Sequence, residues 1–210
     1  MRPAAKFIAT VLLAAWLTTP ASAQSKGAPN SIFVFGGRAT ETTLAQSAYA
    51  PWTIKFYDLG VVGASYSRRL GTVNEIFGDF GLGSIGDDLT IEAEIGGGFR
   101  FGIEDLGEAW TALYLRYDGF PWNETVYTTM AFNTGASLLM ETSVFEVERD
   151  SHEPSSRLLH YLAPEITIAN PENRDLELVL RFHHRSNVFG LVDEVNSGST
   201  FISAGIRKRF

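Results

Sequence analysis

Strict alternation between apolar and polar side chains is the feature that most limits how this chain can fold. Between residues 89 and 101 the even positions carry Glu92, Glu94 and Arg100. The odd positions are apolar or glycine: Leu89, Ile91, Ala93, Ile95, Gly97, Phe99 and Phe101. Because successive side chains of a β-strand point to opposite faces, this segment predicts a strand with one apolar and one polar face.

The same period recurs along the chain and predicts eight strands. The expected ranges are 31–39, 55–69, 88–102, 109–118, 125–141, 158–169, 175–187 and 199–210. Several reach the roughly 9–11 residues with which a tilted strand crosses a bilayer. The segment 70–87 stays open, because Glu75 to Phe80 could form an additional strand. An even number of strands closes a sheet without an exposed edge and keeps both termini on one side.

The first residues have the pattern of a secretory signal peptide. Arg2 and Lys6 precede an apolar run over residues 7–17, and Ala21-Ser22-Ala23 follows. We therefore expect a signal peptide over 1–23 and a β-barrel domain over 24–210. The apolar run is too short for a transmembrane helix. The chain has no cysteine, so an exported domain must be stable without disulfides.

The net charge limits the partners of this chain, and the apolar strand faces limit its fold class. Lysine and arginine number 17 against 24 acidic residues, a net charge of −7 that argues against nucleic acid as a partner. Two folds fit the alternation: a soluble periplasmic β-domain, and an outer-membrane barrel with ion pairs in its lumen. The terminal Phe210 is typical of chains handled by the outer-membrane barrel assembly machinery. We predict an all-β, eight-stranded antiparallel transmembrane β-barrel.

The apolar face of the strand predicted over 175–187 ends in His184 and Ser186. These two positions lie about 7 Å apart along one face of a strand. A serine hydroxyl becomes a nucleophile when a neighbouring base takes its proton, and imidazole suits that role near neutral pH. Asn187 and the backbone amide of Gly190 are candidate oxyanion donors. A polar pair facing lipid has a desolvation cost without a packing benefit, which favours a functional role.

Two other histidines lie near this pair. If the turn over 170–174 centres on residue 172, His160 pairs opposite His184 on the same face. His183 points to the face opposite His184, so the two adjacent histidines are not expected to ligate one metal ion. No cofactor is expected.

In these segments the sequence resembles the outer-membrane lipid A 3-O-deacylase family, the PagL-like acyloxyacyl hydrolases. The resemblance is carried by His184-Arg185-Ser186-Asn187, by the turn Asn196-Ser197-Gly198 and by the end Arg207-Lys208-Arg209-Phe210. Looser similarity extends to the segments 120–123 and 159–165. The resemblance is densest in the last two strands.

This resemblance implies an esterase that removes the 3-O-linked hydroxyacyl chain from lipid A of lipopolysaccharide. Ser186 would be the nucleophile and His184 the general base. The family's third residue is a glutamate at the start of the final strand, where this chain has Ser199 and Thr200. Glu194 is the first candidate for the missing acid and Asp193 the second. Without either, the site would act as a dyad or be inactive.

Two other functions remain as alternatives. A non-catalytic outer-membrane barrel, serving a structural or surface-interaction role, would have lost the catalytic acid. A soluble periplasmic β-barrel would bind a small apolar ligand instead.

Overall fold

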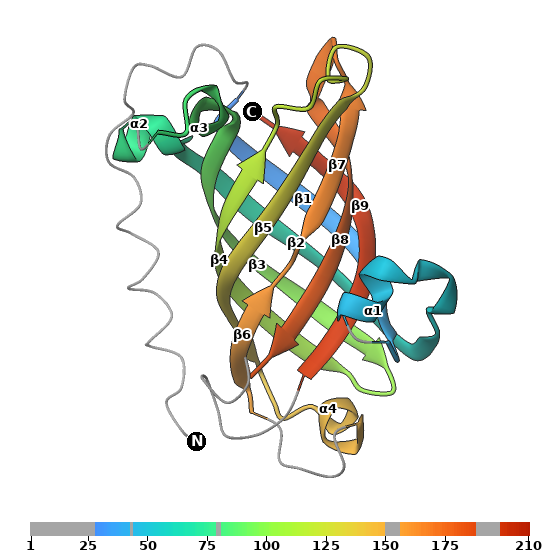
Figure 1. The fold of residues 1–210 in the computed structure, drawn as a ribbon. Helices are drawn as coiled ribbons and strands as arrows, with labels where there is room; N and C mark the ends of the chain where they lie inside the picture. Colours follow the sequence, from blue (N-terminus) through green and yellow to red (C-terminus); the bar gives the residue numbers. More distant parts are fainter. Residues whose placement is uncertain (1–27, 43, 79–80, 150–155, 188–197) are drawn as a thin grey trace.

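The chain forms a closed antiparallel β-barrel (Figure 1). The computed structural model describes residues 28–42, 44–78, 81–149, 156–187 and 198–210. The strands are β1 (Asn30–Thr40), β2 (Phe56–Thr72), β3 (Leu89–Gly102), β4 (Leu106–Tyr117), β5 (Tyr127–Leu139), β6 (Leu158–Leu162), β7 (Glu165–Asn170), β8 (Asn173–Ser186) and β9 (Gly198–Arg209). Neighbouring strands pair in chain order and β1 pairs with β9, which closes the sheet.

Strands β6 and β7 together occupy one position in the ring, so the barrel has the eight strand positions that the sequence predicts. Both pair with β5 on one side and β8 on the other. The break falls at Ala163 and Pro164, because proline has no N–H to donate to the ladder. The side chain of Asn133 on β5 bridges the gap: it donates to the Tyr161 carbonyl at 3.3 Å and accepts from the Ala163 amide. The prediction of one continuous strand over 158–169 is therefore wrong, because this segment forms two strands, β6 and β7.

The two ends of the barrel differ in their connections. Both described termini lie at one end, here called the terminus end, where Asn30 and Phe210 exchange backbone hydrogen bonds of 3.1 and 2.9 Å. The opposite end, here called the outer end, carries α1 (Leu44–Tyr49), the 3-10 turn η1 (Pro51–Thr53) and α4 (Val144–Arg149) (Figure 1). Outer-membrane barrels have their longer loops on the extracellular side, which orients the outer end outward.

The segment left open between the second and third strands is helical. It forms α2 (Val73–Phe77) and α3 (Ser84–Asp88) at the terminus end. Thr72 and Glu75 form a capping box, with the Thr72 hydroxyl accepting from the Glu75 amide and the Glu75 carboxylate accepting from the Thr72 amide. Residues 75–77 are therefore helical rather than an additional strand, and residues 79–80 lie outside the described residues. Among the described residues, no helix is both long and apolar enough to cross a membrane.

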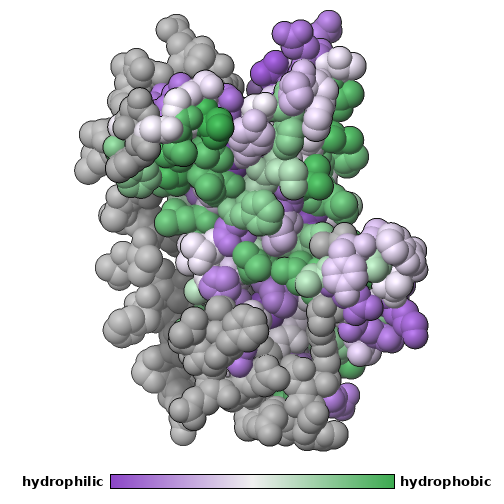
Figure 2. Space-filling view, in the orientation of Figure 1, coloured by the Kyte–Doolittle hydropathy of each residue, from purple (hydrophilic) through white to green (hydrophobic). Residues whose placement is uncertain are grey.

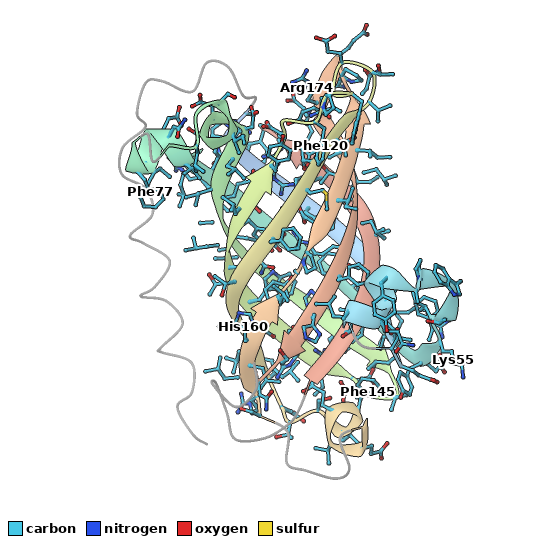
Figure 3. The ribbon with its side chains drawn as sticks, viewed as in Figure 1. Lys55, Phe77, Phe120, Phe145, His160 and Arg174 are labelled. Atoms are coloured by element: carbon cyan, nitrogen blue, oxygen red, sulfur yellow. The ribbon has the colours of Figure 1, made fainter. Side chains whose placement is uncertain are left out.

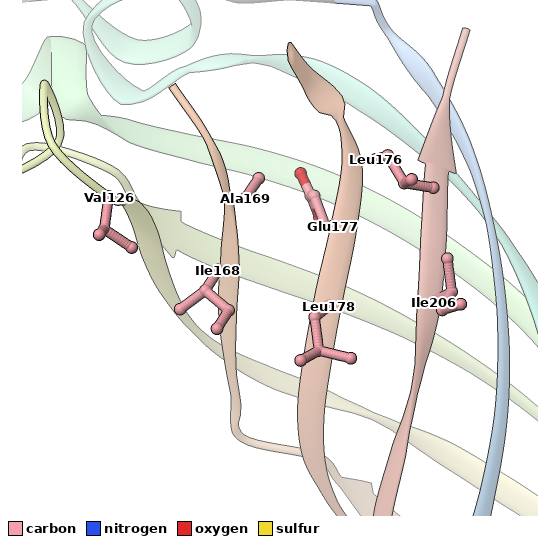
Figure 4. Close-up of a pocket in the computed structure, with 7 residues that line it drawn as sticks. All are labelled: Val126, Ile168, Ala169, Leu176, Glu177, Leu178 and Ile206. Carbon is pink, nitrogen blue, oxygen red and sulfur yellow. The ribbon is translucent and has the colours of Figure 1, made fainter. Parts of the chain in front are cut away.

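The alternation of the sequence separates the two sides of the barrel wall. Leu178 on β8 is 55% exposed on the outside, while its neighbour Glu177 is 1% exposed on the inside. Every strand has exposed large apolar residues on its outward face, as expected for contact with lipid. A shallow apolar groove lies on this outer surface near the terminus end, between β5, β7, β8 and β9 (Figure 4).

The lumen is filled by a lattice of buried ion pairs. At its centre the Glu165 carboxylate contacts Arg116 at 2.5 Å, Arg181 at 2.7 Å and Arg207 at 2.8 Å. Arg181 also contacts Glu94 at 2.9 Å. Each of these side chains is almost fully excluded from solvent. Buried charges are tolerated because each is paired and hydrogen-bonded.

Removing one carboxylate from this lattice should be costly. In Glu165→Gln three arginines lose the negative charge they share, and breaking a buried pair in this way costs about 3–5 kcal/mol. We expect the urea midpoint of the barrel in lipid vesicles to fall accordingly. Lys208→Gln is the matched control, because its pair with Asp175 (3.4 Å) is half-exposed and worth less than about 1 kcal/mol. Equal shifts in the two variants would show that the lattice does not hold the barrel together.

Candidate functional site

A cluster of polar side chains interrupts the apolar outer surface near the outer end of the barrel. We call it the outer-face cluster; its members lie on the outward side of four neighbouring strands and are Thr134 on β5, His160 on β6, His184 and Ser186 on β8, and Thr200 on β9, whose side chain is buried. Figure 3 shows His160 in the half of the barrel that holds α4, far from Arg174 at the terminus end. The cluster therefore lies close to the loops that we orient outward.

Thr200 holds the His184 ring in place. The two residues are direct cross-strand partners on β8 and β9, and His184 Nδ1 lies 2.8 Å from Thr200 Oγ1. In a serine–histidine site, the third residue bonds to the ring nitrogen that does not face the serine. Thr200 contacts Nδ1 of His184 and leaves Nε2 as the other ring nitrogen. Where the family resemblance implies a glutamate, the start of the final strand thus offers a hydroxyl, which can orient the ring but brings no negative charge.

Ser186 lies two residues beyond His184 on the same face of β8 and is partly exposed. Its Oγ makes no hydrogen bond with another described residue. Nucleophile–base hydrogen bonds are often long or absent before substrate binds, so this geometry is compatible with a resting site. The spacing from the sequence is confirmed as a shared face, because both residues are outward and the lumen-facing Arg185 lies between them.

His160 does not face His184 as the sequence register predicted. It pairs with Ser186, and Leu162 pairs with His184. The register is shifted by an irregularity between Ala169 and Asn170 beside the turn, which residue counting from the turn cannot detect. The observed register differs from the predicted one by two residues. Because side chains alternate with a period of two, His160 still lies on the same face of the sheet as Ser186. His160 Nε2 lies 2.9 Å from Thr134 Oγ1.

The remaining predicted residues lie at the edge of the described structure or beyond it. Asn187 follows the end of β8 and is buried. Gly190, Asp193 and Glu194 lie outside the described residues, so the oxyanion role of Gly190 and the acid role of Glu194 or Asp193 stay predictions.

His183 lies inside the barrel, as the alternation predicted. Its Nε2 lies 2.9 Å from Glu108 and its Nδ1 lies 3.1 Å from the Tyr161 hydroxyl. The ring packs edge-on against Trp110 at 5.0 Å between centroids. Its partners are in the lumen, whereas His184 bonds to Thr200 on the outward side of the barrel wall. Within the described residues, no group of histidine and acidic side chains is arranged to hold a metal ion.

A buried brace lies directly behind the outer-face cluster. Glu146 of α4 enters the outer end of the lumen and its Oε1 lies 3.0 Å from Arg185 Nε, 2.7 Å from Ser199 Oγ and 3.2 Å from Arg100 NH1. Arg185 lies between His184 and Ser186, and Ser199 precedes Thr200. The carboxylate therefore holds the ends of β8 and β9 together from inside. No sequence signal pointed to Glu146, because its helix lies about 40 residues from the motif.

No protein-family model and no curated protein matches the sequence. Solved structures do: the fold is similar to that of Neisserial surface protein A (NspA), with a TM-score of 0.50 and 14% identity over 88% of this chain and 100% of that chain. It is also similar to the outer membrane enzyme PagL, with a TM-score of 0.51 and 10% identity over 85% and 99%.

The fold is that of an outer-membrane β-barrel. At these identities the similarity establishes architecture and does not extend to chemistry. The prediction of an eight-stranded antiparallel transmembrane barrel is confirmed. The similarity to PagL is consistent with the family resemblance, while NspA shows that this architecture is shared more widely.

The role of Glu146 in joining the ends of β8 and β9 can be tested by amide hydrogen exchange. In Glu146→Ala the ends of β8 and β9 lose their common partner, so their backbone hydrogen bonds should open more often. We expect faster amide hydrogen exchange over 184–186 and 199–201, with little change over 176–178 and 206–208. Glu148→Ala, at an exposed position of the same helix, is the control. Uniform acceleration along both strands would instead indicate global destabilisation.

Proposed function

We propose that this protein is an outer-membrane esterase that hydrolyses the 3-O-linked hydroxyacyl chain of lipid A in lipopolysaccharide. The observation that carries the proposal is the hydrogen-bonded His184–Thr200 pair beside Ser186, on the lipid-facing surface near the outer end. This geometry supports the proposal, because the three side chains would act as base, orienting group and nucleophile where an outer-leaflet lipid would pass. The family resemblance of the His184 to Asn187 motif supplies the substrate class.

The chemistry needs only these side chains. Ser186 Oγ attacks the ester carbonyl carbon while His184 takes its proton, which gives a tetrahedral intermediate with a negative oxygen. The Asn187 side chain and the Gly190 amide are the proposed donors to that oxygen. The intermediate collapses as His184 returns the proton to the departing sugar hydroxyl. Water then hydrolyses the acyl-serine with His184 as base, releasing the hydroxy fatty acid.

Thr200 sets the expected efficiency of this site. A hydroxyl that accepts from Nδ1–H leaves the other ring nitrogen unprotonated and ready to act as base. A neutral hydroxyl cannot stabilise the imidazolium that forms, as a carboxylate would. We therefore expect a slower enzyme than one with the family's glutamate, unless Glu194 supplies the charge.

The substrate reaches the cluster from the side. The site lies on the barrel wall, and its polar atoms are surrounded by the apolar surface that contacts acyl chains. An ester at the headgroup boundary of the outer leaflet would meet Ser186 by lateral diffusion. The apolar groove shown in Figure 4 lies toward the other end of the barrel and takes no part in the proposal.

The second candidate is a non-catalytic barrel with a structural or surface-interaction role. It is favoured by the absence of a carboxylate at Ser199 and Thr200. Under that function Ser186 has no unusual reactivity, and a lipophilic serine-directed probe should label the protein no better than it labels Ser186→Ala.

The first test is mass spectrometry of lipid A after incubation of lipopolysaccharide with the refolded protein. Wild type should remove one 3-hydroxyacyl chain, and Ser186→Ala and His184→Ala should each abolish the loss, because nucleophile and base act as a unit. Both variants should keep the heat-dependent gel shift of a folded barrel. Retained activity in either folded variant would refute the assignment.

The orienting residue can be identified by a second set of variants. Thr200→Val removes a hydrogen bond worth about 1 kcal/mol, so kcat should fall roughly five- to tenfold. Thr200→Glu should raise kcat above that of wild type, because a carboxylate can stabilise the imidazolium. Glu194→Ala should lower kcat if this loop residue carries the replacement acid, and an unchanged rate would point to Asp193 or to a dyad. If Glu194→Ala lowers kcat while Thr200→Val does not, the acid lies in the loop and Thr200 is only a packing neighbour.

A further inference from the structure

In the segment between β2 and β3, polar side chains bond to one another while large apolar side chains are exposed. Asn74 of α2 donates through Nδ2 to the Gly83 carbonyl at 2.9 Å and to Asp87 Oδ1 at 3.0 Å. Gly86 is buried against the same side chain, since a Cβ there would lie 2.1 Å from Asn74 Oδ1. The Thr72–Glu75 capping box adds a second set of polar contacts within the segment, while Asn74 Oδ1 is buried without a hydrogen-bond partner among the described residues.

The outward side of the segment is a continuous group of large apolar residues. They are Ile76 (41% exposed), Phe77 (57%), Leu82 (39%) and Ile85 (54%), here called the α2–α3 patch. Figure 3 shows Phe77 projecting away from the barrel at the terminus end. In water this arrangement would be unfavourable, because four large apolar side chains would stay hydrated beside one another.

The patch continues the lipid-facing surface of the barrel. Leu70, the last fully exposed outward residue of β2, is 49% exposed and directly precedes Gly71, Thr72 and α2. Ile76 packs over Gly71, since a Cβ at Gly71 would lie 3.1 Å from Ile76 Cγ1. The outward residues Leu89 and Ile91 at the start of β3 are only partly exposed. Figure 2 shows hydrophobic side chains gathered at this end of the visible face.

We infer that the α2–α3 patch lies in the headgroup–acyl boundary of the leaflet at the terminus end and binds phospholipid. Short amphipathic elements bury their apolar side about 5–10 Å into this boundary. Continuity with the lipid-facing strands selects lipid as the occupant, because the bilayer that covers Leu70 also reaches the residues packed beside it. Glu75 and Asp87 are engaged with Thr72 and Asn74, so no unpaired carboxylate of these two needs to enter the boundary.

This segment would then act as an anchor that sets the depth of the barrel. A closed barrel with an apolar belt can shift along the membrane normal at modest cost. A patch that sits at one boundary limits that shift. The inference is independent of the esterase proposal, because it concerns the opposite end of the barrel and no residue of the outer-face cluster.

The absence of cysteine from the chain allows a direct test. Phe77→Cys and Ile85→Cys are each labelled with a nitroxide in vesicles of phosphatidylethanolamine and phosphatidylglycerol. Collision with oxygen, which concentrates in lipid, is compared with collision with a water-soluble nickel complex. Leu178→Cys on the strand wall is the lipid reference, and Glu172→Cys in the exposed β7–β8 turn is the water reference.

We expect the oxygen-to-nickel ratio at positions 77 and 85 to be several-fold above that at 172 and to approach that at 178. Ratios at 77 and 85 equal to that at 172 would overturn the inference and place the patch in water. A ratio low for both reagents would also overturn it, because it would mean that protein rather than lipid covers the patch. The heat-dependent gel shift of each labelled variant verifies that the barrel is folded.

Discussion

The structure depends on the pairing of charges inside a narrow barrel. Every strand places one face against lipid, so the opposite face must fill the lumen with whatever polar side chains the alternation supplies. Glu165 gathers Arg116, Arg181 and Arg207, and the lattice spreads from there to Glu94 and its neighbours. In a lumen with little room for water each charge needs a partner, and these partners lie on strands far apart in the sequence.

The same constraint governs the outer-face cluster. Because side chains alternate across the wall, His184, Ser186 and Thr200 have strand neighbours whose side chains bond inside the lumen. Arg185 lies between His184 and Ser186, and Ser199 precedes Thr200; both contact Glu146. The proposed chemistry outside therefore relies on ion pairs inside, and a rigid wall replaces the enclosed pocket that soluble enzymes use to position such groups.

Much of the fold was predictable because a period of two is a local property. Whether a residue is at an odd or even position along its strand decides which face it takes. This explains the inward His183 and the outward His184 and Ser186. Counting residues gave the wrong structure where a proline, a bulge or a helix cap changed the local backbone. Pro164 interrupts one strand, a bulge beside Asn170 moves His160 opposite Ser186, and the Thr72–Glu75 capping box makes a helix where a strand was an open option.

The sequence by itself determined the fold class, the sides of the wall and the His184–Ser186 pair, since each depends on neighbours along one strand. Only the tertiary structure decided that Thr200 bonds to His184 and that Glu146 joins β8 to β9. Those contacts depend on the register between strands and on how a loop helix enters the lumen. Register is set by bulges, turns and packing around the closed ring, which no local pattern encodes.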